Sequence, residues 1–151
     1  MLSLARNVAE YYSEKSIYIY SFQDSQDYEV CMKFKNYLEL INPKLRTTLI
    51  YQRTNKEMVE SFKKMDYLIA MRFHACLLAV KYGIPTLPIS YDEKVEKFAR
   101  ELGLDYLKLD EIDKIKELVE KLRLIDMEKV NEVVALKKLD FGPIFEIINA
   151  E

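Results

Sequence analysis

Five short runs of β-branched, aromatic and aliphatic residues recur along this chain, and a pattern of helical period follows each of them. The runs predicted as strands are Ser16–Phe22, Arg46–Tyr51, Tyr67–Ala70, Thr86–Ile89 and Tyr106–Leu109. Strands that alternate with helices along a chain build a parallel sheet that helices cover on both faces. We therefore predict an α/β fold with a parallel five-stranded sheet, in a single domain over residues 1–151.

The helices are predicted from apolar spacing and from capping residues. They are a leading helix with Leu4, Val8 and Tyr11, and further helices at about 26–40, Thr54–Met65, Phe73–Tyr82, Asp92–Leu102, Asp110 to about Leu124, and after Asp126. The apolar stripe of the helix at 26–40 is predicted to be Val30, Phe34, Tyr37, Leu38 and Ile41. Thr54 and Glu57 have capping-box spacing, and Pro88 weakens the fourth strand. We expect the tail Phe141–Ile148 to pack back on the body.

The order of the strands decides where a ligand can bind. Right-handed crossovers favour a sheet with the first strand in the centre, the second on one side, and the other three on the other side. Ligands of such sheets bind beyond the carboxyl ends of the strands, where the order reverses. We therefore expect a crevice between Gln23–Asp27 and Arg72–His74, with Ser90–Lys94 beside it.

Composition and motifs exclude several classes of function. The formal net charge is −2, so no basic field attracts nucleic acid. The chain has no GxGxxG, GxxxxGKS or GxxxxGKT motif, which removes the usual dinucleotide and P-loop sites. Cys31 and Cys76 have no CxxC partner, so we expect two buried free thiols and no metal site. No apolar run reaches the roughly 20 residues of a membrane span, and we expect a cytoplasmic protein.

Two residues at the start of the predicted helix Phe73–Tyr82 have the wrong charge for their position. A helix N-terminus is partially positive, so stability alone favours Asp or Glu there, whereas this chain has Arg72 and His74. A bound phosphate or carboxylate resolves the conflict, because arginine, histidine and unpaired backbone N–H groups all favour anions. The alternative is structural: Arg72 pairs with Asp66 or Asp92, and His74 is a core residue.

The segment after the first strand is rich in polar residues. Gln23 and Gln26 can form hydrogen bonds with hydroxyl groups of a ligand, and Asp27 can act as a base. A structural role is the alternative, because Asp24 or Ser25 can cap the following helix and Asp27 suits its first turn.

The segment after the fourth strand is open to the same two interpretations. Tyr91 is large and placed where crevice walls form, and Lys94 is a candidate binding residue beside it. Alternatively, Ser90 or Asp92 is a helix cap and Lys94 is one more surface charge.

Several segments together carry a family resemblance. Those that match are Ser21–Gln23 with Asp27 (Pro-Phe-Gln…Asp), Arg72–Ala75 (Arg-Leu-His-Ala), Gly83–Pro85 (Gly-Val-Pro) and Ser90–Lys94 (Ser-Tyr-Asp-x-Lys). With this spacing the chain resembles the polysaccharide pyruvyl transferase family over roughly residues 15–107, in the branch that modifies cell-wall polymers for surface-layer anchoring. It departs from the family pattern at Phe73, which replaces Leu, and at Ser21, which replaces Pro.

The resemblance implies a fold and an activity. It implies a Rossmann-like three-layer domain like the C-terminal half of a B-type glycosyltransferase fold. It also implies transfer of pyruvate from phosphoenolpyruvate to a sugar as a cyclic ketal, with release of phosphate and without a cofactor. Family chains are about twice this length, so we expect that an N-terminal half is absent and that this chain alone is inactive. The expected partners are phosphoenolpyruvate and a cell-wall glycan precursor; a lipid-linked precursor would place the protein at the inner face of the membrane.

The site residues follow from both lines of reasoning. The resemblance puts Arg72 and His74 on phosphoenolpyruvate. We predict as catalytic residues His74 and Asp27, and as substrate-binding residues Arg72, Gln23, Tyr91 and Lys94. Two other functions remain open: the nucleotide-sugar-binding half of a B-type glycosyltransferase or epimerase, in which Asp92 would hold a ribose, and a non-catalytic phosphate-binding domain.

Overall fold

The computed structural model describes residues 1–136, apart from the side chain of Asn55. The chain divides into two compact units, the first over Met1–Arg53 and the second from Thr54 onward. The tail Phe141–Ile148, expected to pack on the body, lies outside the described residues. Within residues 1–136, no helix is long and apolar enough to cross a membrane.

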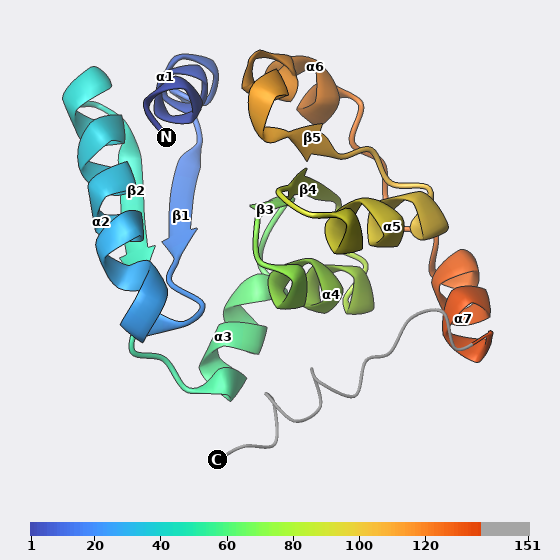
Figure 1. Cartoon of the computed structure of the whole chain (residues 1–151). Coiled ribbons are helices and arrows are strands. Elements are labelled where there is room, and N and C mark those ends of the chain that lie inside the picture. Colours follow the sequence, from blue (N-terminus) through green and yellow to red (C-terminus); the bar gives the residue numbers. More distant parts are fainter. Residues whose placement is uncertain (137–151) are drawn as a thin grey trace. The chain divides into compact units, whose positions relative to one another are not determined.

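The first unit is a pair of parallel strands with two helices (Figure 1). Its elements are α1 (Leu2–Tyr11), β1 (Ser16–Tyr20), α2 (Asp24–Ile41) and β2 (Arg46–Ile50). The strands are aligned from Ser16 opposite Arg46 to Tyr20 opposite Ile50. Helix α2 contacts both strands, and α1 contacts α2.

The apolar stripe predicted for α2 is only partly buried. Leu38 is fully buried, whereas Val30 is 50% exposed and Ile41 is 39% exposed. The sequence pattern therefore identified the helix but overestimated how much of its apolar face the first unit covers.

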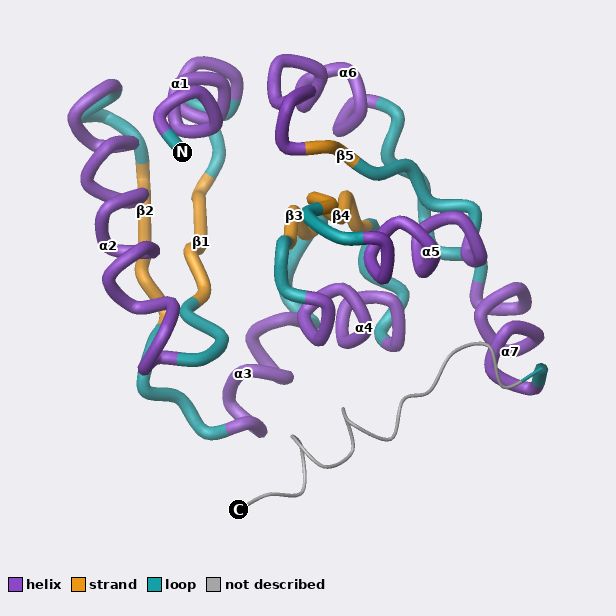
Figure 2. The backbone as a smooth tube through the Cα atoms, viewed as in Figure 1, coloured by secondary structure: helices purple, strands orange, loops and turns teal. Residues whose placement is uncertain are grey.

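The second unit contains a three-stranded parallel sheet in the order β3–β4–β5 (Figure 2). Its elements are α3 (Asn55–Phe62), β3 (Leu68–Ala70), α4 (Phe73–Lys81), β4 (Thr86–Ser90), α5 (Glu93–Leu102), β5 (Leu107–Lys108), η1 (Leu109–Lys114), α6 (Ile115–Glu120) and α7 (Met127–Ala135). Every residue of the central strand β4 is buried, as are Ala75 to Val80 of α4. This sheet and α4 form the core beneath the candidate site.

The parallel α/β arrangement is confirmed, but the single five-stranded sheet is wrong. Strand β1 pairs with β2, and β3 pairs with β4, so the predicted β1–β3 pairing does not form. Alternation of strands and helices indicates parallel pairing, yet it does not specify which strands are neighbours when a crossover separates them. Strand β3 has only three residues, and the β4–β5 ladder covers only Ile89 and Ser90, directly after Pro88. Proline donates no ladder hydrogen bond, which agrees with the short pairing.

Several helix boundaries follow the predicted caps. Thr54 and Glu57 form the capping box of α3. Gly83 and Gly103, which follow α4 and α5, have φ values of 67° and 68°, in the left-handed region that favours glycine. The helix predicted from Asp110 to about Leu124 is instead a 3₁₀ helix, η1, with non-helical backbone angles at Glu111, followed by the short α6, which ends at Glu120.

Candidate functional site

The start of α4 has no acidic residue to complement its dipole. Arg72 is the N-cap, its side chain makes no capping hydrogen bond, and the first turn contains no Asp or Glu. Ala75 to Val80 of α4 are buried, whereas Met71 and His74 at its start are exposed, so the partially positive N-terminus of the helix lies at the surface. The backbone N–H groups of the first turn have no partner within the helix. The geometry of this turn therefore suits an anion.

Phe73 joins the start of α4 to the start of α5. Its ring packs edge-on against Phe98, with centroids 5.4 Å apart, and Phe98 is only 3% exposed. The ammonium group of Lys94 lies over the Phe73 ring, 4.1 Å from the centroid. Lys94 is in the first turn of α5, so this contact brings a cation from α5 to the N-terminus of α4.

His74 lies in a positively charged environment. Its side chain is exposed, which excludes the alternative that it is a core residue. Its pKa is nevertheless lowered, first by partial loss of water around the ring and then by the positive charges of Lys94 and Arg72. Three of the predicted site residues, Arg72, His74 and Lys94, are thus close enough to interact electrostatically. An anion among them would favour the protonated imidazole and raise its pKa.

The turn between β4 and α5 holds Tyr91 at the surface. Tyr91 is 52% exposed, whereas Ser90 before it is buried. Asp92 caps α5, because its carboxylate accepts a hydrogen bond of 3.0 Å from the backbone N–H of Val95. The capping role that the sequence left open for Asp92 is therefore confirmed.

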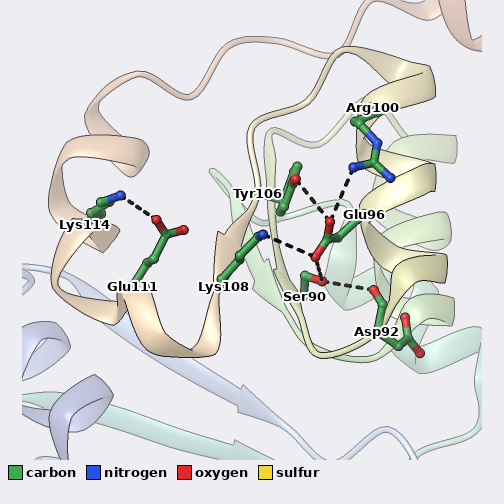
Figure 3. A network of polar contacts seen from close by, with 8 residues as sticks. All are labelled: Ser90, Asp92, Glu96, Arg100, Tyr106, Lys108, Glu111 and Lys114. Atoms are coloured by element: carbon green, nitrogen blue, oxygen red, sulfur yellow. Dashed lines mark hydrogen bonds and ion pairs between the residues drawn. The ribbon is translucent and has the colours of Figure 1, made fainter.

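Glu96 fixes the same turn from inside α5 (Figure 3). Its carboxylate accepts hydrogen bonds from Ser90 at 3.3 Å and from Tyr106 at 3.3 Å. Arg100 and Lys108 approach it at 3.4 and 3.9 Å. The Ser90 hydroxyl is also 3.0 Å from the carbonyl oxygen of Asp92, so its single proton serves one acceptor at a time.

Sequence reasoning missed the Glu96 cluster. The spacing of Glu96 and Arg100 predicts an i,i+4 ion pair on α5. The contacts with Ser90, Tyr106 and Lys108 depend on the pairing of β4 with β5, for which the sequence has no local signal. The cluster ties the carboxyl ends of both strands to α5, and so holds the turn that carries Tyr91.

The remaining two predicted site residues, Gln23 and Asp27, lie in the first unit. Gln23 is exposed and is the N-cap of α2, and its backbone N–H donates a hydrogen bond of 3.0 Å to the Asp27 carboxylate. Asp24 and Ser25, the expected caps, are instead the first two residues of the helix. Asp27 thus has a structural role at the start of α2, and its role as a base stays a prediction.

A second feature of the first unit was not predicted. Asp24, Tyr28, Tyr51 and Gln52 line an open pocket at the carboxyl ends of β1 and β2. The Asp24 carboxylate accepts a hydrogen bond of 2.7 Å from the backbone N–H of Gln52, and the two tyrosine rings are 4.9 Å apart. Gln52 has a φ of 49°, which is unusual for a residue other than glycine.

The two cysteines differ in their surroundings. Cys76 is fully buried in α4, and burial raises the pKa of its thiol to about 12, so it is an inert core residue. Cys31 is only half-buried, which corrects the expectation that both thiols are buried.

Comparison with known proteins decides the family. A model of the family described as polysaccharide pyruvyl transferase matches residues 2–93, more than half of the chain. The chain belongs to the polysaccharide pyruvyl transferase family. No curated protein and no solved structure matches it. Members of a pyruvyl transferase family use a pyruvate donor and a polysaccharide acceptor. The matched residues include Arg72, His74 and Tyr91 and end just before Lys94.

Proposed function

We propose that the start of α4 binds phosphoenolpyruvate, the donor in pyruvyl transfer to a cell-wall polysaccharide. The observation that carries this proposal is the convergence of Arg72, His74 and Lys94 at a helix N-terminus without an acidic residue. Phosphoenolpyruvate has a phosphate and a carboxylate, so it presents two anionic groups to these side chains. The guanidinium of Arg72 can bind either group with two parallel hydrogen bonds.

The reaction requires one proton to be supplied to the donor and two to be removed from the acceptor. In ketal formation the methylene carbon of phosphoenolpyruvate gains a proton, two sugar hydroxyls add to the neighbouring carbon and lose their protons, and phosphate leaves. We assign the proton donor to His74, because a bound anion raises its otherwise lowered pKa. Asp27 is the proposed base, and Gln23 and Tyr91 are proposed to contact the sugar.

The proposal extends to the second unit as a whole. The β3–β4–β5 sheet, with its polar residues beyond the carboxyl end of β4, supports the proposal that this region is the donor-binding half of a B-type glycosyltransferase-like fold. The alternative function, binding of a nucleotide sugar, has less support, because Asp92, the residue that would hold the ribose, caps α5.

A thermal-shift screen tests the proposal with three ligands: phosphoenolpyruvate, inorganic phosphate and a nucleoside diphosphate. We expect saturable stabilisation by phosphoenolpyruvate, weaker stabilisation by phosphate, and loss of both effects in Arg72→Ala. Stabilisation by the nucleoside diphosphate alone would point to the nucleotide-sugar function. Equal stabilisation by phosphate and phosphoenolpyruvate would point to a phosphate-binding domain.

A further inference from the structure

We infer that Phe73 is a positioning residue, whose ring holds the Lys94 ammonium group beside His74 at the start of α4. The consequence for substrate rests on the proposed function, but the positioning itself does not. A leucine at this position would offer no aromatic face to the ammonium group.

The ring of Phe73 is itself fixed. It packs edge-on against Phe98 at 5.4 Å, and Phe98 belongs to the buried face of α5. An aromatic ring that a buried neighbour holds in one orientation presents its negative face in a constant direction. The Lys94 ammonium group lies 4.1 Å from the centre of that ring, well within the range of a cation–π interaction.

The ring is also the principal restraint that the structure offers to this ammonium group. Lys94 forms no ion pair with any residue in the described part of the chain. The carboxylate of Glu96, two residues further along α5, interacts instead with Ser90, Tyr106, Arg100 and Lys108. Lys94 is exposed and has a flexible four-carbon stem. Without the contact with the ring, its ammonium group would therefore sample many positions in water.

The position of Lys94 matters because its positive charge acts on the pKa of His74. Lys94 is, after partial loss of water, the largest contributor to the lowered pKa of His74. A lysine that is held by the ring places a steady positive charge at the anion site. A lysine released from the ring would leave Arg72 and His74 with a weaker field.

The test uses His74 as a reporter, since it is the only histidine in the chain. An NMR titration of the imidazole against pH is carried out on the wild type, Phe73→Leu, Lys94→Met and the double variant. We expect Phe73→Leu and Lys94→Met each to raise the pKa of His74. In the Lys94→Met background, Phe73→Leu should have no further effect. Phe73→Tyr keeps the aromatic face and should leave the pKa unchanged, and thermal melts verify that each variant is folded.

Two results would overturn the inference. One is an unchanged His74 pKa in Phe73→Leu. The other is a change in the His74 pKa on Phe73→Leu that is equal in the wild type and in the Lys94→Met background. This would mean that the ring acts on His74 by packing alone.

Calorimetry with phosphoenolpyruvate separates this inference from the proposed function. Loss of a cation–π contact at an exposed site corresponds to about twofold to fivefold weaker binding in Phe73→Leu, with no loss in Phe73→Tyr. Coupled pKa shifts without phosphoenolpyruvate binding to any variant would support the positioning role and contradict the proposed function. Binding of phosphoenolpyruvate to the wild type without coupled pKa shifts would support the proposed function and contradict the positioning role.

Discussion

Helices α4 and α5 lie side by side in the second unit, yet their N-termini are built in opposite ways. Helix α5 begins with the Asp92 cap, has Glu93 and Glu96 in its first turn, and so meets its own electrostatic needs. Helix α4 begins at Arg72 without a side-chain cap or an acidic residue. The rings of Phe73 and Phe98 pack the two helices against each other. The two N-termini are therefore compared within one packed part of the molecule.

The comparison separates a helix start that stabilises the fold from one that is available to a ligand. A carboxylate in the first turn of α4 would add stability but would repel an incoming anion. The cationic start gives up that stability, and binding of an anion restores it. The four predictions that follow test this difference, beginning with the largest expected effect.

Arg72→Ala should weaken phosphoenolpyruvate binding by about tenfold to a hundredfold, because a charge-assisted hydrogen bond contributes about 1.5–3 kcal/mol. The melting temperature without ligand should stay close to that of the wild type. Arg72→Lys should also weaken binding, since it lacks the two-pronged guanidinium. The matched control is Arg100→Ala on α5, which should bind as the wild type does; calorimetry compares all four proteins. Unfolding of Arg72→Ala, with normal binding by its folded fraction, would assign Arg72 a structural role.

Asp92→Ala should have the opposite profile. Loss of a helix cap lowers the free energy of unfolding by about 1 kcal/mol, and urea denaturation measures this loss. The affinity for phosphoenolpyruvate should change much less than in Arg72→Ala. A stability equal to that of the wild type would show that the Asp92 cap contributes little.

His74→Glu makes the start of α4 resemble that of α5. A negative charge near a helix N-terminus stabilises by about 0.3–1 kcal/mol, so the free energy of unfolding should rise. The same variant should fail to bind phosphoenolpyruvate. Destabilisation by His74→Glu would contradict the assignment of an unmet dipole to α4.

The smallest expected effect is on the pH dependence of stability. The pKa of His74 in the folded protein lies below its value in the unfolded chain, about 6.5. The associated stability is therefore fully present above about pH 6.5 and is lost as the pH falls through the folded pKa, because the unfolded chain binds the proton more readily. Urea denaturation at pH 7.5 and 5.5 should show a larger loss for the wild type than for His74→Gln. An equal loss in both proteins would remove His74 as the source.

The sequence predicted the local features of this molecule well and the non-local ones poorly. Apolar runs located the strands, and Thr54, Gly83 and Gly103 marked helix boundaries, because each of these signals acts within a few residues. The pairing of β1 with β2 alone, and the Glu96 cluster across β4 and β5, depend on contacts between distant segments.

The candidate site shows the same division. The wrong sign of charge at Arg72 and His74 was visible in the sequence, because a helix dipole is a local property. The contact of Lys94 with the Phe73 ring was not visible in the sequence, because it requires α4 and α5 to pack together.

The most direct test of an anion site at the start of α4 is an NMR titration of the single histidine with phosphoenolpyruvate. The His74 imidazole resonances should move saturably as ligand is added, and the pKa of His74 should rise in the complex. Arg72→Ala should show neither change at the same ligand concentrations, while Arg100→Ala should behave as the wild type does. Resonances that stay in place, with an unchanged pKa at saturating phosphoenolpyruvate, would contradict the account.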